Sequence, residues 1–157
     1  MTGLVAMAAA LLAAPSARAQ IGPADCSVAS TPLMFGIYLG NRPTPTDLTA
    51  IVTVTCTARG SLAASVAFKV VAADGGNASR LMRSALGALR YQLFVDAAHS
   101  VPWGDGTAGT VALSGSGAVS PTLPLRQSFT LYGRVLARQT VVPAGAYQDS
   151  VPIRMNW

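Results

Sequence analysis

Residues 50–56 read Ala50-Ile-Val-Thr-Val-Thr-Cys56, and from the first valine onward two kinds of side chain alternate. The valines and the cysteine fall on one side of an extended chain, and the threonines fall on the other. Alternation with a period of two residues is typical of a β-strand that buries one face and exposes the other. This stretch therefore predicts a strand that contributes one apolar face to a core.

The same alternation recurs in other segments of the chain, and short turn-forming clusters separate them. The alternating segments are residues 66–70, 89–96, 129–135 and 147–157. The separating clusters are rich in Gly, Pro, Asn, Asp or Ser and comprise residues 41–45, 74–77, 104–106, 114–117 and 143–145. Six or seven short strands at this spacing predict an all-β fold, a single antiparallel β-sandwich.

The last alternating segment is expected to lie at the edge of a sheet. Val151, Ile153, Met155 and Trp157 share its apolar face, and no further strand follows to cover them. Pro152 lies within the segment and has no N–H to donate to a neighbouring strand. One side of this strand should therefore be unpaired or weakly paired.

Residues 1–19 are predicted to be a secretory signal peptide. Residues 4–14 form an uninterrupted apolar run, Pro15 breaks it, and Ala17-Arg18-Ala19 supplies the small residues of a cleavage site. The run is shorter than the roughly 20 apolar residues that a membrane-spanning helix needs, and no later segment is apolar for long enough. The mature chain is expected to be one domain over residues 20–157, without a transmembrane segment.

Two cysteines, Cys26 and Cys56, remain in the predicted mature chain. Export would place them in an oxidising compartment, where a disulfide between a single pair is the default. A zinc site is disfavoured, because two thiols and one histidine do not complete a tetrahedral ligand set. We therefore expect a disulfide that ties the first strand to the second.

The charge of the chain does not indicate a nucleic-acid partner. The net charge is +5, and removal of Arg18 with the signal peptide leaves +4. The basic residues are scattered between Arg42 and Arg154, with no run and no basic helix. A solvated surface explains this distribution better than a nucleic-acid interface does.

No constellation of catalytic or metal-binding residues stands out. Residues 104–109 match the glycine spacing of a dinucleotide-binding loop, but they lead into a β-like stretch instead of a helix. No G-x-S-x-G elbow occurs, and His99 is expected to be a solvent-exposed loop residue. Asp96 and Asp105 are too few for calcium, which takes about 6–8 oxygen ligands. We therefore expect no enzyme activity, no cofactor and no metal.

A series of short motifs resembles the spore coat protein U domain family, which overlaps the archaic, Csu-type chaperone–usher pilins. The resemblance covers Cys26 to Trp157 and rests on the order and spacing of the motifs together. The motifs are residues 26–38, 52–56, 80–82, 89–96, 103–107, 132–134, 139 and 143–149.

The resemblance implies an incomplete immunoglobulin-like sandwich that lacks its final strand. In that family a periplasmic chaperone lends a strand during export, and the N-terminal extension of a sibling pilin subunit replaces it in the fibre, by β-augmentation. It implies passage through the periplasm and an outer-membrane usher to the cell surface, as a structural or adhesive subunit of a fibre or coat. The edge formed by Val151, Ile153, Met155 and Trp157 is then expected to bind the chaperone or donor strand.

The sequence departs from polymerising members of the family before Cys26. Only residues 20–25 separate the predicted cleavage site from Cys26, and six residues reach at most about 20 Å. We therefore expect a subunit that accepts a strand without donating one, at a fibre tip. Val101, Pro102 and Leu113 are candidates for contact with the bound surface, with burial as the alternative. The rival hypothesis is a self-sufficient exported module that binds a glycan or a small ligand.

Overall fold

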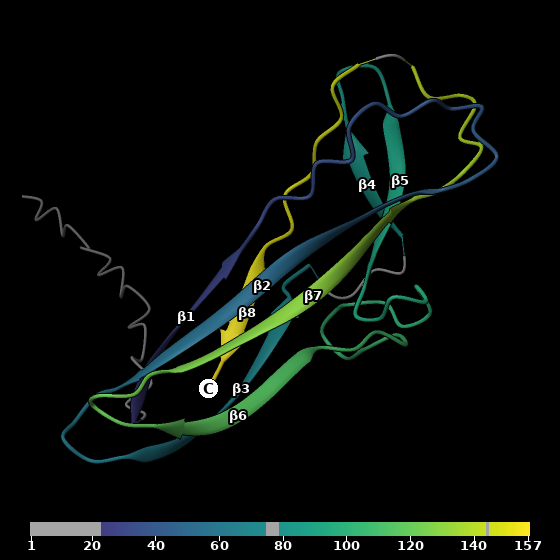
Figure 1. Ribbon diagram of the computed structural model, residues 1–157. Coiled ribbons are helices and arrows are strands. Elements are labelled where there is room, and N and C mark those ends of the chain that lie inside the picture. Colours follow the sequence, from purple (N-terminus) through teal and green to yellow (C-terminus); the bar gives the residue numbers. More distant parts are fainter. Residues whose placement is uncertain (1–22, 75–78, 144) are drawn as a thin grey trace, which may run out of the picture.

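The computed structural model describes residues 23–74, 79–143 and 145–157 (Figure 1). Within these ranges every regular element is a β-strand, and no helix occurs. The strands are β1 (Ala24–Ser30), β2 (Thr46–Ala58), β3 (Ala64–Ala72), β4 (Arg80–Arg83), β5 (Ala88–Phe94), β6 (Leu113–Val119), β7 (Leu125–Val135) and β8 (Ile153–Asn156). The predicted signal peptide lies outside the described residues. No helix of the described part is long and apolar enough to span a membrane.

The strands form two sheets in which all the strand pairs are antiparallel. One sheet has the order β1-β2-β7-β5-β4, and the other has the order β6-β3-β8. The two sheets enclose one apolar core between them (Figure 1). The predicted all-β antiparallel sandwich is confirmed.

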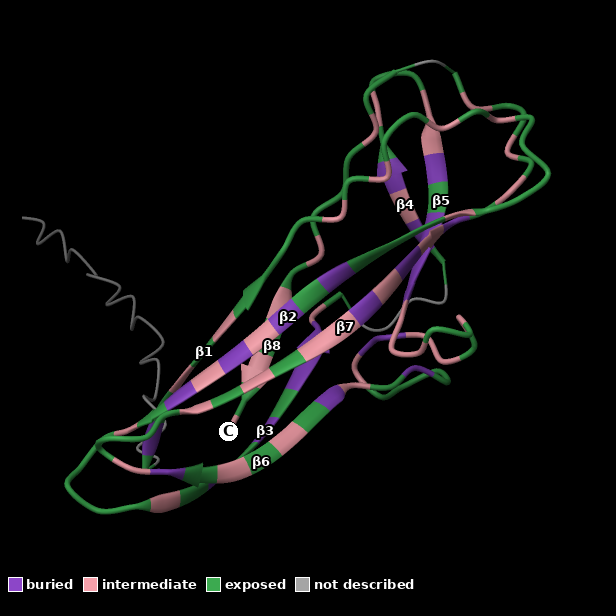
Figure 2. Cartoon of the chain, in the orientation of Figure 1, coloured by how far each residue is buried: buried purple, intermediate pink, exposed green. Residues whose placement is uncertain are grey.

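The alternation in β2 places its apolar face in this core. Val52, Val54 and Cys56 are fully buried, and buried bands alternate with less buried ones along the strand (Figure 2). Trp103, from the loop after β5, is the largest fully buried side chain of the described residues. The core therefore combines strand faces that the sequence predicts with a loop tryptophan.

One predicted turn is wrong, because residues 114–117, read as a Ser-Gly cluster between strands, belong to β6. The glycines in this strand are required by close packing. A Cβ atom on Gly115 would lie 2.6 Å from Cζ of Phe68, and one on Gly117 would lie 2.6 Å from Cδ1 of Leu125. Glycine allows these side chains to approach the backbone of an edge strand.

The last strand is shorter than predicted, since regular pairing covers only β8 and not residues 147–152. The Pro152 carbonyl accepts a hydrogen bond from Ala73 N–H at 2.8 Å, but proline has no N–H to donate in return. Before this point the chain leaves β3, and Gln148 instead forms a two-bond bridge with Arg83 of β4. The segment therefore crosses from one sheet to the other.

Candidate functional site: an open groove between two edge strands

Each sheet ends in a strand with one unpaired edge, and two of these edges border the same gap. Among the strands of the described chain, β1 pairs only with β2, and β8 pairs only with β3. The two strands run in opposite directions (Figure 1). At one end of the gap, the indole N–H of Trp157 donates to the carbonyl of Ala24 at 3.0 Å. A further strand lying in the gap would run antiparallel to one edge and parallel to the other.

The register of β1 decides which of its backbone groups face the gap. Pro23 and Thr31, which flank the strand or extend it, each form a backbone hydrogen bond of 3.0 Å with the β2 side. Bonding alternates along an antiparallel pair, so the odd-numbered residues of β1 bond to β2. The N–H and C=O groups of the even-numbered residues therefore point into the gap. These residues are Ala24, Cys26, Val28 and Ser30.

The register of β8 produces the same arrangement on the opposite side. Because the Pro152 carbonyl accepts a hydrogen bond from Ala73, the residue after β3, the even-numbered residues of β8 face β3. Ile153 and Met155 therefore direct their backbone polar groups into the gap. Their side chains point toward the core and are half-buried, whereas the residues that alternate with them are exposed. The predicted edge strand with one apolar face is confirmed in its geometry.

The gap opens into an apolar groove. One part has a volume of about 410 Å³, with walls formed by residues after β1 and before β8. A second part has a volume of about 860 Å³ and lies between residues 33–41 and residues 140–147. Leu33, Phe35 and Met82 line both parts, so the two are adjacent. The floor of the first part consists of core side chains, among them Ala50, Val52, Leu93, Trp103 and Leu131.

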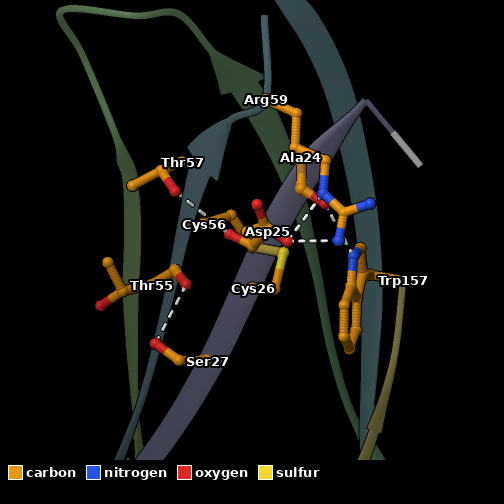
Figure 3. Close-up of a disulfide and its surroundings, with 9 residues drawn as sticks. All are labelled: Ala24, Asp25, Cys26, Ser27, Thr55, Cys56, Thr57, Arg59 and Trp157. Atoms are coloured by element: carbon orange, nitrogen blue, oxygen red, sulfur yellow. Dashed lines mark hydrogen bonds and ion pairs between the residues drawn. A yellow bond between two sulfur atoms is a disulfide. The ribbon is translucent and has the colours of Figure 1, made fainter. Parts of the chain in front are cut away.

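Near Trp157, β1 is joined to its own sheet by a disulfide and an ion pair (Figure 3). Cys26 and Cys56 form a disulfide between β1 and β2, as predicted. Next to it, the Arg59 guanidinium donates from Nε to Oδ1 of Asp25 at 2.7 Å. This hydrogen bond lowers the pKa of Asp25 below its ordinary value of 3.8. The first strand of the groove wall is therefore tied to the sheet at its beginning.

Polar groups gather at the other end of the groove's first part. The Tyr91 hydroxyl donates to Oδ2 of Asp149 at 2.6 Å. Burial of the phenol, followed by the hydrogen bond to the carboxylate, raises the pKa of Tyr91 well above 10. Arg80, the cross-strand partner of Tyr91, is buried and pairs with Asp74 through both of its terminal nitrogens. Tyr91 and Asp149 both line the groove.

The structure brings the predicted edge residues together, with two of them on the groove lining. Val151 and Ile153 line the first part, while Trp157 lies outside it and hydrogen-bonds across the gap to Ala24. The sequence analysis places Cys26 in a first strand but does not place that strand opposite β8. The Cys-Ser-Val-Ala-Ser alternation of residues 26–30 indicates the strand and carries no information about which strand faces it.

The three candidates for contact with a bound surface differ in how far they are buried. Leu113 is a core residue with 7% of its surface exposed, so its assignment as a surface contact is wrong. It begins β6 and points between the sheets. Val101 and Pro102 are half-buried and hydrogen-bond to the end of β5 and to Val111, respectively. The large apolar side chains that are exposed near the groove's second part are Met34, Ile37, Leu39 and Val141.

The remaining candidate residues, His99, Asp96 and Asp105, pack against aromatic rings or cap turns. The expectation of a solvent-exposed His99 is wrong, because its side chain is only 9% exposed and lies edge-on to the rings of Phe94 and Tyr132. Asp96 accepts hydrogen bonds from Ser100 and Val101, and Asp105 accepts two from Thr107; each caps its own turn. Within the described residues, no three His, Cys, Asp or Glu side chains are placed to share a metal ion.

Within the described residues, the fold is a two-sheet antiparallel sandwich whose edge strands β1 and β8 have facing unpaired edges beside an apolar groove. The chain belongs to the Spore Coat Protein U domain family, whose signature it matches over residues 11–154. This confirms the resemblance seen in the sequence.

A solved structure supports the immunoglobulin-like sandwich. It is the CsuC–CsuE chaperone–tip adhesion subunit pre-assembly complex from archaic chaperone–usher Csu pili of Acinetobacter baumannii, with a TM-score of 0.52 and 17% sequence identity. The similarity covers 85% of this chain and 40% of that chain, so this protein spans less than half of its structural relative. No curated protein matches the sequence.

Proposed function

We propose that this protein is a structural subunit of a chaperone–usher surface fibre or coat, and that the groove between β1 and β8 accepts a β-strand from another protein. A periplasmic chaperone supplies the strand during export, and a sibling subunit supplies it after assembly. The observation that carries the proposal is the pair of unpaired edges, whose backbone groups face one gap above an apolar floor.

The physical reason is that both features are unfavourable while the groove is empty. Free edges expose unpaired N–H and C=O groups, and natural proteins usually protect such edges. The groove also exposes apolar surface, which favours burial by about 25 cal/mol per Å². One inserted strand would pair both edges and cover the floor at once, as in other cases of β-augmentation.

The proposal includes the route of the chain. The signal peptide predicted for residues 1–19 would direct it to the periplasm, and an outer-membrane usher would then pass it to the cell surface. The disulfide between Cys26 and Cys56 suits an oxidising compartment on this route.

We extend the proposal to a terminal, adhesive position in the fibre. A donor segment needs an alternating stretch before the first strand, and cleavage after Ala19 would leave only residues 20–23 before β1. Gly22 and Pro23 suit a donor strand poorly. Edman sequencing of the mature protein, combined with immunogold labelling of assembled fibres, tests this position. A long alternating N-terminal extension, or label along the whole shaft, would exclude it.

The strand-accepting groove is tested by two matched substitutions in β8. Ile153→Glu places a charge on the groove side, whereas Arg154→Glu changes the neighbouring residue on the outer side. We expect only Ile153→Glu to abolish co-purification with a chaperone encoded beside the subunit. Equal co-purification of both variants would reject the assignment.

A second measurement does not depend on the folding of a variant. The unmodified subunit, produced without a chaperone, should aggregate or remain poorly folded. A synthetic peptide with alternating apolar residues should raise its thermal unfolding temperature. A subunit that is monomeric, stable and unaffected by such peptides would instead favour a self-sufficient binding module.

A further inference from the structure

The first part of the groove has an apolar floor, but one carboxylate, that of Asp149, also lines it. Asp149 is exposed, lies just before the segment that leads into β8 and lines the groove. Its Oδ2 accepts the Tyr91 hydroxyl at 2.6 Å, and its Oδ1 accepts the N–H of Ser150 at 2.9 Å. A carboxylate can accept about four hydrogen bonds, so roughly half of this capacity faces water.

The negative charge of Asp149 has no cation of its own within the described part of the chain. The nearby Arg80 is engaged by Asp74, through two guanidinium nitrogens, and its side chain is only 2% exposed. Over residues 23–74, 79–143 and 145–157, no ion pair includes Asp149. The group formed by Asp74, Arg80 and Asp149 therefore carries a net charge of −1, in a chain whose net charge is +5.

An inserted strand would change the surroundings of this carboxylate. It would remove water from the lining of the groove, and a charged group that is covered without a partner is strongly unfavourable. A wholly apolar strand would cover the Asp149 carboxylate without supplying a positively charged partner. A lysine or arginine on the incoming strand would supply both the missing charge and the missing hydrogen-bond donors.

We propose that the groove selects a strand that presents a cationic side chain, lysine or arginine, to Asp149 and apolar side chains to the remaining floor. This inference rests on the proposed function, since it concerns the partner of the same groove. Asp149 lies before the first residue of β8, whereas Trp157 follows its last residue, so the two mark opposite ends of this segment. In a strand antiparallel to β8, the cation therefore follows the apolar positions, toward the strand's C-terminal end.

The test uses synthetic peptides and the oxidised mature chain. Each peptide carries three alternating apolar residues and then, two positions after the last of them, a lysine, a glutamine or a glutamate. The proteins are the unmodified chain, Asp149→Asn and the control Asp105→Asn. The amide introduced by Asp149→Asn keeps an acceptor for the Tyr91 hydroxyl, and Asp105 lies in the loop before β6, outside the groove lining.

For the unmodified chain, we expect the lysine peptide to bind about tenfold or more tightly than the glutamate peptide, with glutamine between them. The preference should weaken as salt is added. It should disappear in Asp149→Asn and persist in Asp105→Asn. Equal affinities of all three peptides for the unmodified chain would overturn the proposal, as would a lysine preference that survives in Asp149→Asn. Failure of every peptide to bind would reject the strand-accepting groove itself, and with it the proposed function.

Discussion

The two arginine–aspartate pairs next to the groove differ in burial, and this difference predicts that removal of the aspartate destabilises the protein much more in one pair than in the other. Arg80 and Asp74 have side chains that are 2% and 33% exposed, whereas those of Arg59 and Asp25 are 35% and 60% exposed. Asp74→Ala would leave the Arg80 guanidinium buried without its carboxylate. Asp25→Ala would leave the Arg59 guanidinium in contact with water, since 35% of its side chain is already exposed.

The expected cost of Asp74→Ala follows from this burial. Removing one partner of a buried ion pair costs roughly 3–5 kcal/mol of unfolding free energy. Because a third of the Asp74 side chain is exposed, we expect a value near the lower end, about 3 kcal/mol. The double variant Asp74→Ala/Arg80→Met should regain most of this loss, since it removes the uncompensated charge as well.

Urea denaturation of the oxidised protein, followed by the fluorescence of its two tryptophans, Trp103 and Trp157, measures these differences. With a slope of roughly 2 kcal/mol per M urea, Asp74→Ala should lower the midpoint by about 1.5 M. Asp25→Ala should shift it far less, since exposed ion pairs contribute little. Equal shifts for both single variants, or a double variant less stable than Asp74→Ala, would refute the reasoning.

Three further predictions concern the sandwich as a whole. The double substitution Cys26→Ser/Cys56→Ser should lower the free energy of unfolding by roughly 3–4 kcal/mol, because it opens a loop with a sequence separation of 30. The urea midpoint measures this loss, and an unchanged midpoint would contradict the prediction. Gly115→Val should lower the thermal unfolding temperature through collision with neighbouring side chains, whereas Gly60→Ala, with open space around it, should not; equal temperatures would show that β6 can shift freely. The hydrogen bond from Arg134 holds the pKa of the Asp47 carboxyl below 3.8. The stability that this ionised carboxyl contributes is therefore present above about pH 4 and is lost as the pH falls through the lowered pKa. Urea midpoints between pH 7 and pH 3 should fall less steeply for Asp47→Asn than for the unmodified chain.

Local patterns in the sequence determined the fold class and one wall of the groove. Period-two alternation identified β2, β3, β5 and β7, because the apolar face of a strand depends only on the order of its own residues. Pro152 and the apolar residues around it indicated an edge strand for the same reason, and the single cysteine pair predicted the disulfide.

Only the tertiary structure decided which strands face one another and what lies between them. Alternation states which side of a strand is apolar but carries no information about its partner, so the approach of Trp157 to Ala24, 133 residues away, could not be predicted. Local composition likewise indicated a turn at residues 114–117, where the space left by Phe68 and Leu125 requires glycine within a strand. The pairing of Asp149 with Tyr91 depends on contacts across the groove, because the charge of a carboxylate is set by its own chemistry but its partners are set by the fold.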